Sequence, residues 1–312
     1  MRPKENKLNP VRGSRRLEVN RKFILAFEGY RTEAGYFKGV SDNRSRLRIP
    51  SLIDICLLDR YPIQSGSSDP ERVLELLEEY ITFLDCGKCP VGLFISTFIT
   101  QMIPEKEIPY AKDKIDLFIE TASERLRTFC NEGGLVNNSD MAEEACSALY
   151  REVFGVSEKI HFDRPEPIDY RKDRDVVCVI MDRDADSRSH SKCSEFFVRC
   201  KNNGFEPYMT NPCFEMWLLL HFDEVLNEDK RTLQKNEKIN GIRYTEQRLD
   251  EILRSYPANS GYRKDDLDFE SFVHRVDNAI KNERSFCKDT KCIKTEVGSN
   301  IGSLIDRMRQ RN

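Results

Sequence analysis

The chain has 312 residues, of which 39% are apolar and 33% charged, a composition that is typical of globular proteins and excludes an intrinsically disordered chain. Its net charge of −3 excludes a uniformly basic nucleic-acid coat, although 50 Lys and Arg residues are enough for a local basic face. The longest charge-free apolar stretch, residues 91–103, is too short to span a bilayer, and no apolar segment of the secretory type follows the N-terminus. We therefore expect a soluble cytoplasmic protein without a membrane partner.

The first part of the chain is basic and then turns to an α/β pattern. We interpret residues 1–20 as a solvated arm, with contact to nucleic-acid phosphates as the alternative. Residues 23–27 form a continuous apolar run, which predicts a strand covered on both faces, and Glu28 follows this run. We expect Thr32 to cap a helix that starts at Glu33.

A second predicted strand, residues 52–58, leads into a long series of helices. Ser68 or Asp69 is expected to cap the first helix, and Pro70 suits its first turn. Because the helical pattern continues without an intervening strand, residues 86–170 are interpreted as an all-helical insertion. Apolar side chains recur at helical spacing in residues 70–84, 91–102, 115–129 and 139–153.

The α/β pattern resumes at residues 176–181, a β-branched run without charge that predicts a buried strand ending in residues 182–186, DRDAD. A short strand at residues 206–209 and an apolar helix from Pro212 are expected next. The C-terminal third is helical, and Ser299 is expected to cap its last helix. The whole pattern predicts an α/β fold with a mostly parallel, Rossmann-like sheet flanked by helices.

Two of the predicted strands end in acidic side chains. Glu28 follows the first strand, and Asp182 and Asp184 follow the later one, two residues apart and therefore pointing the same way. Ligands of open parallel sheets bind outside the carboxyl ends of the strands. Carboxylates this close repel each other unless a cation intervenes, and Mg²⁺ or Mn²⁺ prefers oxygen ligands. We therefore predict a divalent-metal site, with Asp186 as a further ligand; the alternative is that these acids begin solvated loops.

Five other residues are weaker candidates for the same site. Glu33 is a supporting acid or general base, or else an acid that the helix dipole favours in a first turn, and Glu215 has the same two interpretations. His190 is a candidate for supporting the metal ligands or contacting a phosphate. Arg183 and Lys192 are candidates for neutralising substrate phosphate, although solvated side chains are the default for both.

The 11 cysteines are odd in number and irregularly spaced, so reduced thiols, many of them in the core, are expected. Cys86 and Cys89 would form half of a zinc site only with distant partners such as Cys287 and Cys292, and this interpretation is disfavoured. His221, near the end of an apolar helix, is expected to be a core residue rather than a catalyst.

Four segments of the chain resemble the signature of one protein family. Residues 27–37, FEGYRTEAGYF, resemble EG-x-x-TE-x-x-YF, and residues 67–70 resemble an S-x-DP segment. Residues 179–184 are similar to a strand that ends in D-R-D. Residues 211–222, NPCFEMWLLLHF, closely match NPCFE-x-WLL-x-HF and are the most specific of the four. On these motifs the chain resembles the RloB family, from which the helical block departs.

This resemblance implies a Toprim-like fold in which Glu28, Asp182 and Asp184 hold Mg²⁺ or Mn²⁺. It also implies a nuclease that hydrolyses RNA or DNA as an anti-phage defence effector, with an ABC-type, RloA-like ATPase subunit as a partner. The alternative is a non-catalytic subunit of such a complex that binds nucleic acid or a nucleotide, and homo-oligomerisation fits either function. The implied division of the chain is a basic arm at residues 1–20, a Toprim-like domain at residues 21–85 and 171–312, and a helical insertion at residues 86–170.

Overall fold

The computed structural model describes residues 21–29, 31–58, 70–183, 190–256 and 261–310. The predicted basic arm at residues 1–20, the caps Ser68 and Asp69, and the acids Asp184 and Asp186 lie outside the described residues. Within the described residues, no helix combines the length and the apolar character that crossing a membrane requires.

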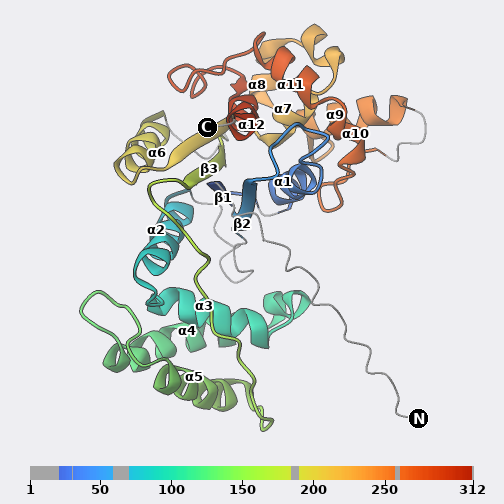
Figure 1. The fold of residues 1–312 in the computed structure, drawn as a ribbon. Coiled ribbons are helices and arrows are strands. Elements are labelled where there is room, and N and C mark those ends of the chain that lie inside the picture. Colours follow the sequence, from blue (N-terminus) through green and yellow to red (C-terminus); the bar gives the residue numbers. More distant parts are fainter. Residues whose placement is uncertain (1–20, 30, 59–69, 184–189, 257–260, 311–312) are drawn as a thin grey trace, which may run out of the picture.

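The chain alternates strands and helices near both ends and is helical in its middle (Figure 1). The predicted α/β class, with a mostly parallel sheet flanked by helices, is confirmed. The strands are β1 (Arg21–Phe27), β2 (Ile53–Leu58), β3 (Val176–Asp182), β4 (Glu206–Asn211), β5 (Lys238–Ile239), β6 (Ile242–Arg243) and β7 (Gly298–Ser299). The helices are α1 (Thr32–Asp42), α2 (Pro70–Cys86), α3 (Val91–Met102), α4 (Lys112–Leu126), α5 (Ser139–Phe154), α6 (His190–Asn202), α7 (Phe214–Leu219), α8 (Lys230–Lys235), α9 (Tyr244–Ser255), α10 (Glu270–Val273), α11 (Val276–Glu283) and α12 (Ile301–Arg309).

The central sheet has five strands in the order β2-β1-β3-β4-β7. Strands β2, β1, β3 and β4 run parallel, and β7 pairs antiparallel with β4. Since β2 is added on one side of β1 and β3 on the other, the direction in which strands are added reverses between β1 and β3. In open α/β sheets the ligand crevice forms at such a point, outside the carboxyl ends of the strands. The topology therefore directs attention to the ends of β1 and β3.

Alternate residues of the central strands pack against different sets of helices, as expected for a strand covered on both faces. Phe23 and Leu25 of β1 belong to a core shared with α1, α7, α9 and α12. Ile24 and Ala26 belong to a second core shared with α2 and α6. Figure 1 accordingly shows α2 and α6 on one side of the sheet and α1 on the other. The continuous apolar run of β1 thus serves two cores.

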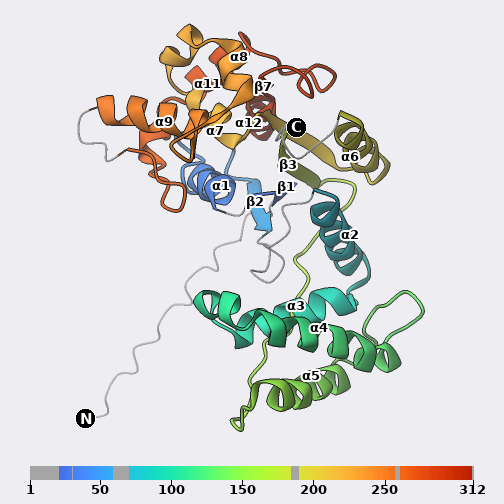
Figure 2. The same cartoon turned by 180° about the vertical axis from the view of Figure 1, so that it is seen from behind.

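Helices α3, α4 and α5 form a separate layer beyond the end of α2, in both views of the molecule (Figures 1 and 2). They bury a core of their own, in which the rings of Phe98 and Phe118 stack with centroids 5.8 Å apart. Residues 155–175, all described, contain no helix, although a helical block had been expected up to residue 170. Pro165 and Pro167 lie in this stretch, and proline lacks the N–H that a helix interior requires.

Two expected helix caps, Thr32 and Ser299, do not occupy the cap positions of their helices. Thr32 is the first residue of α1 rather than its cap, and its hydroxyl donates to the Lys264 carbonyl (3.2 Å). Asn300, not Ser299, occupies the cap position of α12. The Ser299 hydroxyl still accepts a hydrogen bond from the N–H of Ile301 (3.1 Å), and so satisfies one amide of the first turn.

The expectation of reduced thiols throughout is wrong for Cys287 and Cys292, which form a disulfide in the segment between α11 and β7. The segment folds back so that their Cα atoms lie 6.3 Å apart, within the range that a disulfide spans. These two residues are therefore not available as zinc ligands to Cys86 and Cys89. The other nine cysteines are free thiols.

Candidate functional site

Strands β1 and β3 end side by side, with Glu28 and Asp182 at their tips. Phe27 pairs with Ile180 in the parallel register, and the N–H of Glu28 donates to the Ile180 carbonyl (3.1 Å). The N–H of Asp182 donates in turn to Oε2 of Glu28 (3.2 Å). The structure therefore brings together two of the four acids that the sequence analysis assigned to one metal site, and the other two, Asp184 and Asp186, lie outside the described residues.

Glu33 joins them from the first turn of α1. Its carboxylate lies directly against Gly29, because a Cβ at that position would come within 2.3 Å of Oε2 of Glu33. The side chain is only 6% exposed. Burial, together with the neighbouring carboxylates of Glu215 and Glu28, raises the pKa of Glu33 to about 7. Glycine after β1 is thus a requirement for folding Glu33 back toward the strand ends.

Asp182 experiences the same two influences. Burial raises the pKa of Asp182 well above its usual range, and the carboxylates of Glu33, Glu28 and Glu215 add to the rise. One hydrogen bond acts in the opposite direction, since the hydroxyl of Thr210 on the adjacent β4 donates to Oδ1 of Asp182 (2.7 Å). The site therefore favours a bound proton or cation at Asp182 over a bare carboxylate.

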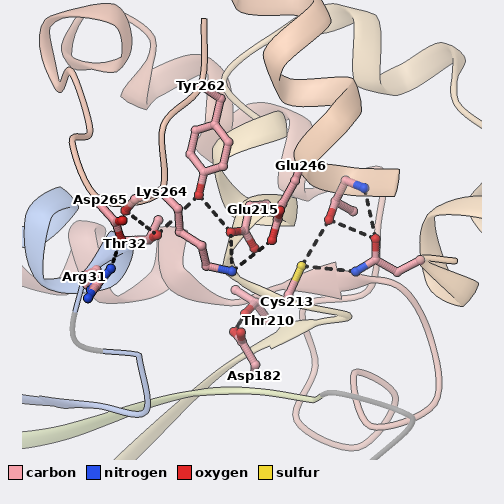
Figure 3. Close-up of polar contacts among 12 residues, drawn as sticks. Arg31, Thr32, Asp182, Thr210, Cys213, Glu215, Glu246, Tyr262, Lys264 and Asp265 are labelled. Carbon is pink, nitrogen blue, oxygen red and sulfur yellow. Dashed lines mark hydrogen bonds and ion pairs between the residues drawn. The ribbon is translucent and has the colours of Figure 1, made fainter. Parts of the chain in front are cut away.

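Glu215 completes the acidic group from the first turn of α7, where it is 3% exposed. The hydroxyl of Tyr262 donates to Oε1 of Glu215 (2.8 Å), and Nζ of Lys264 lies 3.5 Å from the same oxygen (Figure 3). Lys264 also donates to Oε1 of Glu246 (2.9 Å). Burial lowers the pKa of Lys264, but the carboxylates of Glu215 and Glu246 outweigh it and raise the pKa overall. The positive charge of Lys264 is thus shared between two acids.

A cavity of about 160 Å³ opens at this edge of the sheet, and Glu28, Asp182 and Glu215 line it. Cys213, which precedes α7, also lines it. Its thiol lies 3.4 Å from Nδ2 of Asn236, which donates to it. These contacts connect the acidic group to the segment between α8 and α9.

Several lining residues had no signal in the sequence. Lys235, Asn236, Arg243 and Glu246 come from a segment far along the chain from either strand end, and no short motif marks them. Tyr262 and Lys264, which contact Glu215, lie outside the four segments that resemble the family signature. Their convergence depends on the packing of α8 and α9 beside α7, which residue spacing does not reveal.

The remaining predicted site residues are placed only in part. Asp184 and Asp186 lie outside the described residues, and so does the side chain of His190, whose backbone begins α6. Nε of Arg183 donates to a main-chain carbonyl in the segment before β7 (2.6 Å). Lys192 lies exposed in the first turn of α6. The roles assigned to these five residues stay predictions.

The donor set suits a hard divalent cation. Glu28, Glu33, Asp182 and Glu215 offer only oxygen atoms. The raised pKa values of Glu33 and Asp182 reflect burial first and then repulsion between the acids, which a cation would relieve. Among the described residues, no three Asp, Glu, His or Cys side chains are placed to hold a metal ion by themselves. Mg²⁺ commonly uses one or two protein carboxylates and completes its shell with water and substrate phosphate. The arrangement therefore fits a cation shared between protein and ligand.

Comparison with known proteins gives one match. The family model described as RloB-like protein matches residues 23–308, from β1 into α12, so the match includes both strand ends, the acidic group and helices α3–α5. No curated protein and no solved structure matches the chain.

Proposed function

We propose that this chain, which belongs to the RloB-like family, is a metal-dependent nuclease that hydrolyses phosphodiester bonds of RNA or DNA. The observation that supports this most directly is the meeting of Glu28 and Asp182 across the ends of two adjacent parallel strands. Glu33 and Glu215 surround them and raise the pKa of Asp182. Buried acids that repel one another are unfavourable for folding, and a site where a cation binds offsets that cost.

In this proposal Glu28 and Asp182 hold Mg²⁺ or Mn²⁺, with Asp184 as a further ligand. The bound cation would supply Lewis acidity to the phosphate group. Glu33, whose carboxylate lies against Gly29 beside the end of β1, is placed to accept a proton from an attacking water. Tyr262 and Lys264 fix the orientation of the Glu215 carboxylate by direct contacts, so they act on the site through Glu215.

The test is cutting of labelled RNA and DNA by the purified chain in Mn²⁺ and in EDTA. We expect Mn²⁺-dependent cutting that Glu28→Gln and Asp182→Asn each abolish, while both variants melt in EDTA no lower than the unaltered chain. Asp113→Asn, an exposed acid on α4, is the matched control and should cut normally. Unchanged cutting by both site variants would remove the assignment.

The family resemblance also supports a setting for this activity, an anti-phage defence system with an ABC-type ATPase subunit as the partner. A protein that binds nucleic acid or the ATPase but cuts nothing in Mn²⁺ would instead favour the non-catalytic alternative. Helices α3–α5 lie apart from the sheet and bury their own core, so a partner can contact them without covering the strand ends (Figure 2).

A further inference from the structure

The cavity at the sheet edge has an acidic side and a basic side, which come from different parts of the chain. Glu28 and Asp182 belong to the ends of β1 and β3. Lys235 and Arg243 belong to the segment that runs from the end of α8 through the β5–β6 hairpin to the start of α9.

The charges of the lining favour an anionic ligand once a metal is bound. A divalent cation at the acids would offset two of the four negative charges of the described lining, which also has three positive side chains. Phosphates pair well with Lys and Arg, so the basic side offers a ligand phosphate a partner close to the bound cation. The lining side chains counted here, among the described residues, are Glu28, Asp182, Glu215 and Glu246 with Lys235, Arg243 and Lys264.

The three cations differ in how firmly they are already bound. Lys264 would have to leave Glu215 and Glu246 to reach a ligand, at contacts of 3.5 Å and 2.9 Å. Lys235 has a contact of 3.6 Å to Glu237, but both side chains are at least 70% exposed, and exposed pairs of this kind contribute little. Lys235 can therefore turn to a ligand phosphate at small cost.

Arg243 is held in a defined place relative to the acids. Its Nη1 donates to the main-chain carbonyl of Asn236 (3.2 Å). Asn236 is 5% exposed and accepts from the N–H of Thr245 (2.9 Å), while its amide donates to Cys213 beside the acidic group. Asn236 also has a positive φ of 45°, a conformation that asparagine tolerates better than most residues. The basic side is thus joined to the acidic side through Asn236.

We propose that Lys235 and Arg243 bind a backbone phosphate of the nucleic acid next to the phosphate that is cut. This inference rests on the proposed function and adds how the strand is positioned. Phosphate contacts fix the register of a strand without reading its bases. The two side chains therefore position RNA and DNA alike, and sequence preference has to come from other residues.

Binding can be measured separately from cutting by working with the full chain carrying Glu28→Gln. Fluorescence anisotropy with labelled single-stranded RNA and DNA, in Mg²⁺ and over a range of salt concentrations, compares two double variants. Lys235→Ala with Arg243→Ala removes the basic side. Arg231→Ala with Lys238→Ala removes the same charge from exposed positions of α8 and β5 that lie outside the cavity lining.

We expect the first double variant to bind at least about tenfold more weakly, with a salt dependence reduced by about one phosphate contact, and the second to change little. Placed in the chain that keeps Glu28, both double variants should keep the rise in melting temperature that Mn²⁺ gives, because neither removes an acid. Equal affinity of the two double variants would overturn the inference, and so would loss of the Mn²⁺ effect in the first alone.

The result also separates this inference from the proposed function. If the unaltered chain cuts nothing while its binding depends on Lys235 and Arg243, the phosphate contact stands and the cutting proposal falls. If the chain cuts nucleic acid but its affinity is the same without Lys235 and Arg243, the phosphate contact is wrong and the cutting proposal stands. Failure of the Glu28→Gln chain to bind either oligonucleotide would overturn the phosphate contact.

Discussion

The carboxyl edge of the sheet and the helical layer α3–α5 bury side chains of different kinds. The described part of α3–α5 buries Ser96, Thr97 and Ser147 as its polar residues, and the first two hydroxyls donate to carbonyls one turn earlier. Its charged residues pair at the surface, as Arg125 does with Glu152. At the sheet edge, by contrast, four carboxylates lie near one another, and burial together with the charges of Glu28 and Glu215 raises the pKa values of Glu33 and Asp182. The difference indicates that packing alone does not account for the acids at the sheet edge.

Glu283, a buried acid away from the sheet edge, provides a comparison because its role is structural. Glu283 is 2% exposed, and burial raises its pKa to about 7, as it does for Glu33. Glu283, however, accepts a hydrogen bond from the N–H of Gly302 in the first turn of α12 (2.9 Å). The hydrogen-bond donor to Glu283 is a main-chain amide of a neighbouring helix, whereas the side chains near Glu33 and Asp182 include other acids. The clustering of acids, rather than burial, is what distinguishes the sheet edge.

The largest expected effect is on the helical layer. Phe118 is fully buried and packs against the rings of Phe98 and Tyr150. Phe118→Ala should lower the free energy of unfolding by about 3–5 kcal/mol, because it leaves a cavity in a packed core. Urea unfolding followed by circular dichroism measures this. The neighbouring Leu117, 53% exposed, provides the control, and an equal loss in Leu117→Ala would contradict the prediction.

The next effect concerns pH and the acids. In EDTA the folded chain should lose stability as pH rises from about 4.5 to about 7, because Glu33 and Glu283 hold protons in the folded state that they release when unfolded. Each shift, from 4.5 to about 7, corresponds to about 3 kcal/mol. Melting temperature measured across this range tests the sign.

Glu33→Gln and Glu283→Gln should each remove part of this pH dependence, and the two variants can be told apart with metal. Mn²⁺ should weaken the pH dependence that remains in Glu283→Gln, where the acidic group is intact. Mn²⁺ should have little effect on the share due to Glu283 itself. A pH dependence in EDTA that neither Glu33→Gln nor Glu283→Gln changes would contradict the raised pKa values of these two acids.

Metal binding is expected to raise the free energy of unfolding by slightly less than the pH effect of each acid. At a Mn²⁺ concentration 100 times its dissociation constant, the gain in unfolding free energy is about 2.7 kcal/mol. Asp182→Asn should abolish this gain, whereas Asp113→Asn on α4 should keep it. Melting curves with and without Mn²⁺ provide the measurement, and an undiminished gain in Asp182→Asn would place the metal elsewhere.

The sequence predicted those parts of this picture that depend on short-range patterns. The apolar runs before Glu28 and Asp182 indicated buried strands, and parallel strands put such ends on one edge. The role of Gly29 was not visible, because the glycine matters only through the carboxylate of Glu33 that lies against it. The disulfide between Cys287 and Cys292 could not be predicted either, because an odd number of irregularly spaced cysteines does not indicate which two are paired.

The basic side of the cavity shows the same limit more clearly. Arg243 is held beside the acids by a hydrogen bond to Asn236. Asn236 in turn bonds to Cys213, 23 residues earlier in the chain, and to Thr245, 9 residues later. Such contacts arise when α8 and α9 pack beside α7, and no periodicity in the chain encodes them. Chemistry at strand ends could be predicted from local sequence, whereas the residues that close the cavity required the tertiary structure.

The smallest expected effect tests whether the side chains that contact the acids also influence metal affinity. The hydroxyl of Tyr262 is shared between Glu215 (2.8 Å) and the hydroxyl of Thr32 (3.3 Å), so it ties α7 to α1 across the site. Tyr262→Phe removes this hydroxyl and keeps the ring. Because groups that orient metal ligands typically change metal affinity by about 10–100-fold when lost, we expect the Mn²⁺ dissociation constant to rise about tenfold.

The change in Mn²⁺ affinity caused by Tyr262→Phe shows whether the Glu215 carboxylate has to be held in one orientation to bind the metal. Titration of Mn²⁺ against melting temperature gives the affinity, and Tyr256→Phe, which removes the hydroxyl that donates to Glu224 (3.2 Å), is the matched control away from the cavity. If both variants bind Mn²⁺ as the unaltered chain does, Glu215 is not oriented for a cation. Its burial beside Lys264 would then be a feature of packing, as the polar residues of α3–α5 are.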